Sequence, residues 1–106
     1  MKSKNNTVYL SYFEKELSKL GFIKEYRFSD KRRFRFDYAY ENKKIAIEIE
    51  GGIWIYGRHN NAKGYKRDME KYNLAVLNGW RVLRFTYNDI NGEYVDNTLN
   101  IIRSIL

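Results

Sequence analysis

The sequence predicts one domain over residues 1–106 of the α/β class, in which helices pack on a mixed α+β sheet. Two segments alternate apolar and polar residues with the period of two expected of a strand that has one buried face. Three other segments carry apolar residues at helical spacing. The chain has no proline, low-complexity stretch or internal repeat that would mark a linker, so we expect a single core.

The first half of the chain predicts a helix followed by three strands. The helix is expected over residues 8–20, because apolar residues recur there at helical spacing and Gly21 suits the position after its end. A short strand is expected over 24–29. The two alternating segments, 33–40 and 45–50, are the second and third strands and are joined by a four-residue loop.

The second half predicts a helix over 62–78, a strand over 80–86 and a last helix that follows a turn. The first of these helices is expected to bury an apolar stripe that consists of Tyr65, Met69, Tyr72 and Val76. The last helix carries apolar residues on one face: Val95, Leu99, Ile102 and Leu106. This order predicts an antiparallel meander, then a crossover to a further strand, with helices covering the sheet.

The apolar residues of the two alternating strands predict how those strands pair. A shared buried face requires the aromatic residues of one strand to lie opposite the isoleucines of the other. A four-residue loop satisfies this requirement. The expected cross-strand pairs are Tyr40 with Ile45, Tyr38 with Ile47, and Phe36 with Ile49.

The same register gathers carboxylates on the opposite face. Asp37 is expected directly across from Glu48, with Glu50 two residues further on and Arg35 across from Glu50. Facing like charges cost from a few tenths to about 1 kcal/mol, and a cation bound between them removes this cost. Magnesium prefers oxygen ligands of this kind, and the glycine pair 51–52 permits close approach. The alternative is a solvated face on which arginines neutralise the acids.

Composition and charge favour a polyanionic partner. Twenty Lys and Arg against thirteen Asp and Glu give a net charge of +7, and 17% of the residues are aromatic, which is typical of nucleic-acid binding. Basic residues flank the carboxylates in the sequence: Lys31, Arg32, Arg33, Arg35, Arg58, Lys63, Lys66 and Arg67. Such cations hold phosphates while a metal ion neutralises charge on the scissile phosphate, so the pattern predicts phosphodiester cleavage.

Several classes of protein are excluded by composition. The absence of cysteine excludes disulfide frameworks, thiolate metal sites and cysteine nucleophiles. The single histidine, His59, excludes a site built on two histidines. No apolar run is long enough for a transmembrane helix and no signal peptide is evident, so we expect a cytoplasmic protein without a membrane partner.

Phe36-Asp37, followed by Ile47-Glu48-Ile49-Glu50-Gly51-Gly52, resembles the core of the PD-(D/E)XK nuclease superfamily. The elements that follow are most similar to its very-short-patch-repair-like branch and to small phage endonucleases: His59, Asp68 with Lys71, and Gly79-Trp80-Arg81-Val82-Leu83-Arg84-Phe85. The resemblance covers roughly residues 30–86. It implies an αβββαβ restriction-endonuclease-like core, here with a C-terminal helix. It also implies a protein that acts in the cytoplasm of a bacterium or of a phage-infected host cell.

The resemblance also implies roles for individual residues. Mg²⁺, or Mn²⁺ in its place, would be held by Asp37, Glu48 and the backbone carbonyl of Ile49. The lysine of the superfamily falls at Glu50, which would then activate the attacking water or bind a second metal ion. Alternatively, Lys71 is the displaced lysine, although a surface lysine paired with a neighbouring acid has the same sequence pattern.

Three further residues are candidates of lower weight. His59 would protonate the leaving group or bind phosphate, and Glu14 and Asp68 are possible additional site residues.

The function expected from the resemblance is a metal-dependent DNA endonuclease, structure-selective or weakly sequence-specific, which leaves a 5′-phosphate and a 3′-hydroxyl. A homodimer is plausible for cutting both strands. The alternatives are a nuclease-fold module that binds DNA or RNA with little or no catalysis, and a Holliday-junction resolvase.

Overall fold

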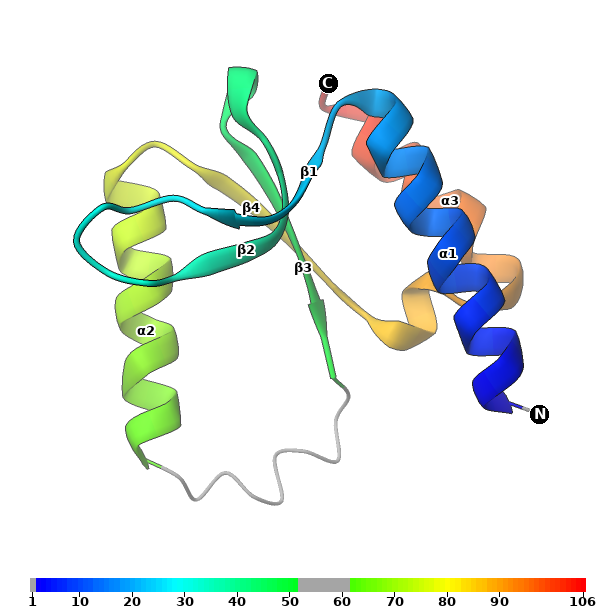
Figure 1. The fold of residues 1–106 in the computed structure, drawn as a ribbon, viewed down its shortest axis with the longest axis horizontal. Coiled ribbons are helices and arrows are strands. Elements are labelled where there is room, and N and C mark those ends of the chain that lie inside the picture. The colour runs from blue at the N-terminus through cyan, green and yellow to red at the C-terminus, as the bar shows by residue number, and fades with distance from the viewer. Residues whose placement is uncertain (1, 52–61) are drawn as a thin grey trace.

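The computed structural model describes residues 2–51 and 62–106, which form an α+β fold with a four-stranded mixed sheet (Figure 1). The elements follow the predicted order of helix, three strands, helix, strand and helix. Their bounds are α1 Lys2–Leu20, β1 Ile23–Arg27, β2 Arg35–Tyr40, β3 Ile45–Glu50, α2 Ala62–Leu77, β4 Arg81–Thr86 and α3 Val95–Ser104. In the described ranges, no helix is both long enough and apolar enough to cross a membrane.

The sheet has the strand order β1-β2-β3-β4. The pairs β1–β2 and β2–β3 are antiparallel, whereas β3 and β4 are parallel. Parallel neighbours require a crossover, and α2 lies in the connection between β3 and β4. The predicted meander followed by a crossover is therefore confirmed.

One face of the sheet is covered by α1 and α3, which lie together on the side opposite α2 (Figure 1). The core on this face joins residues from both helices to the central strands: Phe13, Leu17, Phe22, Tyr38, Ile45, Ile47, Ile90, Val95, Leu99 and Ile102. The apolar spacing that predicts these two helices is thus the spacing of their buried residues. Helix α1 begins earlier than expected, at Lys2 rather than at Val8.

The other face packs against α2 through small and aromatic side chains. Its buried cluster consists of Phe36, Ala39, Ala46, Ala75 and Trp80. The prediction of a buried apolar stripe on α2 is wrong for Tyr65, Met69 and Val76, whose exposed fractions are 54%, 61% and 69%. Helix α2 instead turns Ala75 inward to the alanines of the sheet, and its Lys71 and Tyr72 bind Glu48.

Strand β2 changes the direction of its side chains partway along its length. Phe36 was expected to share a face with Tyr38, but it packs in the opposite core, where its ring stacks on Phe28 with centroids 4.1 Å apart. The alternation breaks at Asp37, between the β1–β2 pairs formed by Tyr38 and Phe36, and Glu25 on β1 has a left-handed backbone with φ +53°. The expectation of one shared aromatic face is therefore corrected at Phe36.

The predicted register between β2 and β3 is confirmed next to their loop, where Tyr40 pairs with Ile45 and Tyr38 with Ile47. The ladder ends there, so the expected pair of Phe36 with Ile49 does not form. Beyond this point β2 continues to pair with β1, and β3 continues to pair with β4. The sheet therefore opens between its two central strands, and the candidate site lies at this opening.

Candidate active site

Asp37 and Glu48 face each other where β2 and β3 separate. The backbone N–H of Asp37 donates to Glu48 Oε2 at 2.8 Å, and the backbone N–H of Ile49 donates to Asp37 Oδ2 at 2.7 Å. Each carboxylate thus accepts a hydrogen bond from a backbone N–H that would bond to a neighbouring strand if the ladder were continuous. The two acids come together as the register predicts, although they do so at a break in the sheet rather than within it.

Glu48 is the buried acid of the pair, with an exposed fraction of 7%. Helix α2 supplies two further donors from consecutive residues: Lys71 Nζ and Tyr72 Oη lie 2.6 Å and 2.8 Å from Glu48 Oε1. The Lys71 side chain is only 15% exposed. A buried carboxylate is stable only when it is paired and hydrogen-bonded, and these donors meet that requirement. Lys71 therefore points into the site instead of pairing with Asp68 on the helix surface.

Glu50 lies two residues further along β3 and is paired with Arg84 of β4. Arg84 Nε donates to Glu50 Oε2 at 2.8 Å, and the guanidinium lies 4.3 Å from the centroid of the Tyr72 ring. The expected partner, Arg35, lies instead 3.8 Å from Glu25 on β1. The prediction for Arg35 is wrong because β2 pairs with β1 at that point and has already separated from β3.

The pKa of Asp37 is raised above its usual value. Burial is the main cause, and the negative charges of Glu48 and Glu50 act in the same direction, while the Ile49 N–H and the Lys71 charge oppose it. The second carboxylate oxygen, Oδ1, accepts no hydrogen bond from any residue that the structure describes. Asp37 thus offers an open oxygen beside an anionic neighbour.

The tyrosine that binds Glu48 remains a hydrogen-bond donor at physiological pH. Burial and the hydrogen bond to Glu48 both raise the pKa of Tyr72. A corresponding pair lies on the α1 side, where Tyr38 Oη donates to Glu14 Oε2 at 2.5 Å and burial raises the pKa of Tyr38. Glu48 of the sheet and Glu14 of α1 therefore each accept a hydrogen bond from a neutral tyrosine.

Glu14 projects from α1 towards the same region but does not join the acid pair. It accepts hydrogen bonds from Tyr38 and forms an ion pair with Lys24 at 3.1 Å. Glu14 and Asp37 line a common pocket of about 250 Å³, together with Tyr87. Glu14 thus shares a pocket with Asp37 and is already neutralised by Lys24.

The predicted phosphate-binding residues divide into two groups. The guanidiniums of Arg32 and Arg67 lie 4.7 Å and 5.2 Å from the centroid of the Phe34 ring, and Arg32 forms an ion pair with Glu70. Lys31 and Lys66 line a groove of about 740 Å³ beside them.

The other predicted cations have fewer contacts. Arg33 and Lys63 are exposed, and Arg35 lies apart with Glu25. Arg58 and His59 lie outside the described residues. The candidate acid Asp68 is exposed on α2. The pKa of Arg84 is raised mainly by its hydrogen bond to Glu50, and the negative charge of Asp68 raises it further. Asp68 is thus close to Arg84.

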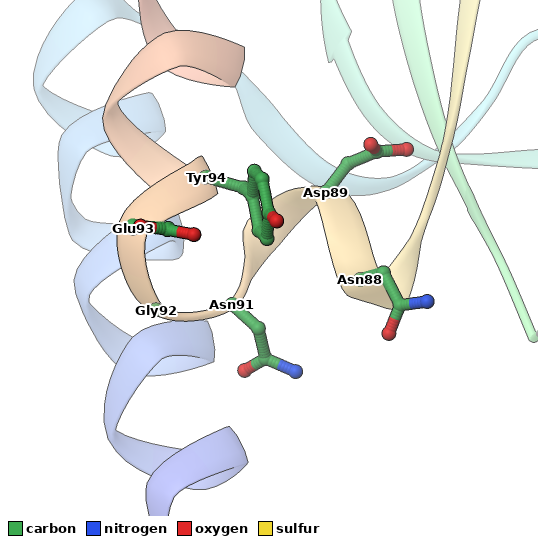
Figure 2. A pocket seen from close by; sticks show the side chains of 6 residues that line it. All are labelled: Asn88, Asp89, Asn91, Gly92, Glu93 and Tyr94. Atoms are coloured by element: carbon green, nitrogen blue, oxygen red, sulfur yellow. The ribbon is translucent and has the colours of Figure 1, made fainter.

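A second hollow, of about 490 Å³, lies at the turns before α3 and contains no predicted site residue (Figure 2). Its acid Asp89 accepts hydrogen bonds from the backbone N–H and the hydroxyl of Thr86, at 2.8 Å and 3.0 Å. Asp89 therefore caps the turn that begins after β4. We assign this hollow a structural role.

A magnesium ion at the sheet opening would be held by few protein oxygens and mostly by water. Over residues 2–51 and 62–106, no three acidic, histidine or cysteine side chains lie close enough together to hold a metal ion between them. Mg²⁺ needs only one or two carboxylates when water completes its shell. Asp37 Oδ1 is open to such an ion, whereas an ion on Glu48 would share its oxygens with the Asp37 N–H, Lys71 and Tyr72. Arg84 already binds one oxygen of Glu50.

The chain matches no protein-family model, and no curated protein or solved structure shows significant similarity to it. The class of site is therefore defined by the geometry of its own residues: an acid pair, a buried lysine and a second ion pair at an opening in a mixed sheet.

Sequence reasoning missed Tyr72 and Arg84 as site residues. The helical spacing predicts Tyr72 in the apolar stripe of α2, yet its hydroxyl donates to Glu48. In the sequence, Arg84 stands out only as part of the family-like motif, yet it is the register partner of Glu48 on the parallel strand. The one signal in the sequence for this contact is that Arg84 lies two residues after Val82 and therefore on the same face of β4.

Proposed function

We propose that this protein is a metal-dependent DNA endonuclease with a restriction-endonuclease-like fold of the PD-(D/E)XK superfamily. The observation that carries the proposal is the pair of Asp37 and Glu48 at the opening between β2 and β3, with Lys71 bound to Glu48 at 2.6 Å. Two carboxylates with an adjacent ammonium are the groups that such phosphodiester hydrolysis uses.

In this proposal Asp37 and Glu48, with the backbone carbonyl of Ile49, hold Mg²⁺ or Mn²⁺. When bound, the ion lowers the pKa of a coordinated water and offsets negative charge on the scissile phosphate. Lys71 stabilises the same developing charge from the side of α2, because its ammonium is fixed by the Glu48 carboxylate. The ion pair of Glu50 with Arg84 favours Lys71 over Glu50 in the role of the superfamily lysine.

The charge of the whole chain supports DNA as the substrate. A net charge of +7 attracts the phosphate backbone, and Arg32 and Arg67 are fixed against Phe34 near α2. We propose structure-selective or weakly sequence-specific cleavage, because cations that contact the phosphate backbone do not read the base sequence. By resemblance, the products are a 5′-phosphate and a 3′-hydroxyl, and a homodimer cuts both strands.

Cleavage of a supercoiled plasmid tests this proposal. We expect the wild type to nick or linearise the plasmid with Mg²⁺ or Mn²⁺ and to be inactive in EDTA, while Asp37→Asn and Glu48→Gln lose activity in all conditions. Glu93→Gln is the matched control, because Glu93 is an exposed acid in the turn before α3. Absence of cleavage by a folded wild type would overturn the proposal, as would full activity of Asp37→Asn.

A second candidate function is a DNA- or RNA-binding module without catalysis. The observation that favours it is that Lys71 and Arg84 already neutralise Glu48 and Glu50 without a metal ion. Binding of duplex DNA and RNA without cleavage, in any divalent metal, is the result this candidate predicts. A four-way junction in the same substrate panel tests the resolvase alternative, which predicts preferential cutting of the junction.

A further inference from the structure

Arg84 occupies a central place beside the acid pair. It lies on β4 as the register partner of Glu48 on the neighbouring parallel strand. Its Nε donates to Glu50 Oε2 at 2.8 Å, and its guanidinium carbon lies 4.3 Å from the centroid of the Tyr72 ring. Two different contacts, one at the edge of the guanidinium and one at its face, therefore fix its orientation.

The arrangement leaves much of the guanidinium open to a ligand. An arginine carries five N–H donors, of which the bond to Glu50 uses the one on Nε. The terminal nitrogens of Arg84 donate to no residue that the structure describes, and the side chain is 50% exposed. A lone exposed ion pair contributes little to stability, so stability alone is a weak reason for this arrangement.

Tyr72 connects this arginine to the acid pair. Its hydroxyl donates to Glu48 Oε1 while its ring lies under the Arg84 guanidinium. The same side chain therefore fixes the position of an acid and the orientation of a cation next to it. The open N–H groups of Arg84 are consequently fixed within the site rather than on a remote surface.

We infer that Arg84 binds a phosphate of the nucleic-acid backbone next to the acid pair, with Glu50 and Tyr72 as its positioning residues. The planar fork of a guanidinium matches two phosphate oxygens, and fixing it in advance reduces the ordering cost of binding. The inference rests on the proposed function in taking nucleic acid as the ligand, but it requires no cleavage.

Salt-dependent DNA binding tests the inference. The wild type and its variants are titrated with a short fluorescent duplex DNA in EDTA over a range of salt concentrations, so that binding is measured without cleavage. Loss of one phosphate contact lowers the slope of log affinity against log salt by about 0.9. We expect this change in Arg84→Gln and in Arg84→Met, which keeps the apolar stem over Tyr72, whereas Arg84→Lys keeps most of the slope.

Arg81→Gln is the matched control. Arg81 is an exposed arginine of the same strand, three residues earlier and therefore on the opposite face. The same loss of one positive charge at Arg81 is expected to leave the slope within error of the wild type. An equal drop in Arg81→Gln would mean that net charge, and not a contact at Arg84, sets the slope.

The outcomes for Arg84 and for the proposed endonuclease are separable. A wild-type slope in a folded Arg84→Gln or Arg84→Met variant would overturn the inference and leave an active nuclease untouched. Conversely, a wild type that binds DNA and never cuts it overturns the endonuclease, while a slope drop at Arg84 still supports the phosphate contact. A wild type that binds no DNA at low salt overturns both.

Discussion

The backbone N–H of Asp37 donates to the Glu48 carboxylate at 2.8 Å, across the opening between β2 and β3. This bond fixes the distance between two acids that would otherwise repel each other. It also occupies one Glu48 oxygen from the β2 side, while Lys71 and Tyr72 occupy the other from α2. Glu48 is thus the residue that joins the sheet to α2, and Asp37 keeps the open oxygen.

Lys71→Met should reduce turnover by orders of magnitude, because it removes the ammonium next to the acid pair. Glu50→Gln should cause a much smaller loss, since Glu50 is paired with Arg84. Rates are compared at saturating DNA, so that differences report on turnover rather than binding. The opposite ranking, with Glu50→Gln the more damaged variant, would assign the activation of water to Glu50.

Tyr72→Phe removes one hydroxyl and keeps the ring beneath Arg84. Loss of the hydrogen bond to Glu48 should lower the free energy of unfolding by about 1 kcal/mol. For a domain of this size we expect a fall in Tm of roughly 4–8 °C. Tyr94→Phe serves as the control, because Tyr94 is exposed in the turn before α3 and should not change the Tm. An unchanged Tm in Tyr72→Phe would show that its hydroxyl does not contribute to the stability of Glu48.

Asp37→Asn should stabilise the metal-free protein, and the gain should depend on pH. Burial in the folded state raises the pKa of Asp37 above its ordinary value, so the folded state holds this proton more firmly than the unfolded chain does. The stability from this group is therefore present below the unfolded pKa and is lost as pH rises through the folded pKa. Asparagine does not ionise and can still accept from the Ile49 N–H.

The measurement is the difference in Tm between Asp37→Asn and the wild type, in EDTA, from about pH 3 to about pH 7. We expect the difference to grow with pH in favour of the variant. A difference that stays constant over this range would contradict a raised pKa at Asp37.

Substitutions to glutamine test which residues of α2 are buried against the sheet. Met69→Gln and Val76→Gln should each change the free energy of unfolding by less than about 0.5 kcal/mol, because both side chains are exposed. Ala75→Gln should destabilise by several times as much, since Ala75 is fully buried between α2 and the sheet. Chemical denaturation of the three variants decides the matter, and a large loss at Met69 would restore the apolar stripe predicted from the sequence.

Local patterns in the sequence were sufficient for most of the fold. The bounds of β3 agree with prediction, and the register at Tyr40 and Tyr38 follows from the alternation of residues next to a short loop. Helices α1 and α3 bury the residues that their spacing predicts, because they face a sheet surface of large apolar side chains.

The errors arise where a residue responds to a partner distant in the sequence. Phe36 changes face where β2 pairs with β1 and no longer with β3, and α2 turns Ala75 inward against a surface of alanines and aromatic side chains. Asp37 and Glu48 meet as their strand register predicts, and Lys71, a candidate through the family resemblance alone, contacts Glu48. Arg84 was missed because its role follows from the parallel pairing of β3 with β4.

Titration calorimetry with Mn²⁺ is the most direct test of the central claim that Asp37 and Glu48 form a metal site. The account predicts one ion per wild-type chain, no detectable binding to Asp37→Asn, and wild-type binding to Glu93→Gln. Binding should also raise the wild-type Tm, since a ligand at 100 times its Kd adds about 2.7 kcal/mol to the free energy of unfolding. Equal Mn²⁺ binding by the wild type and Asp37→Asn, or none by either, would contradict the account.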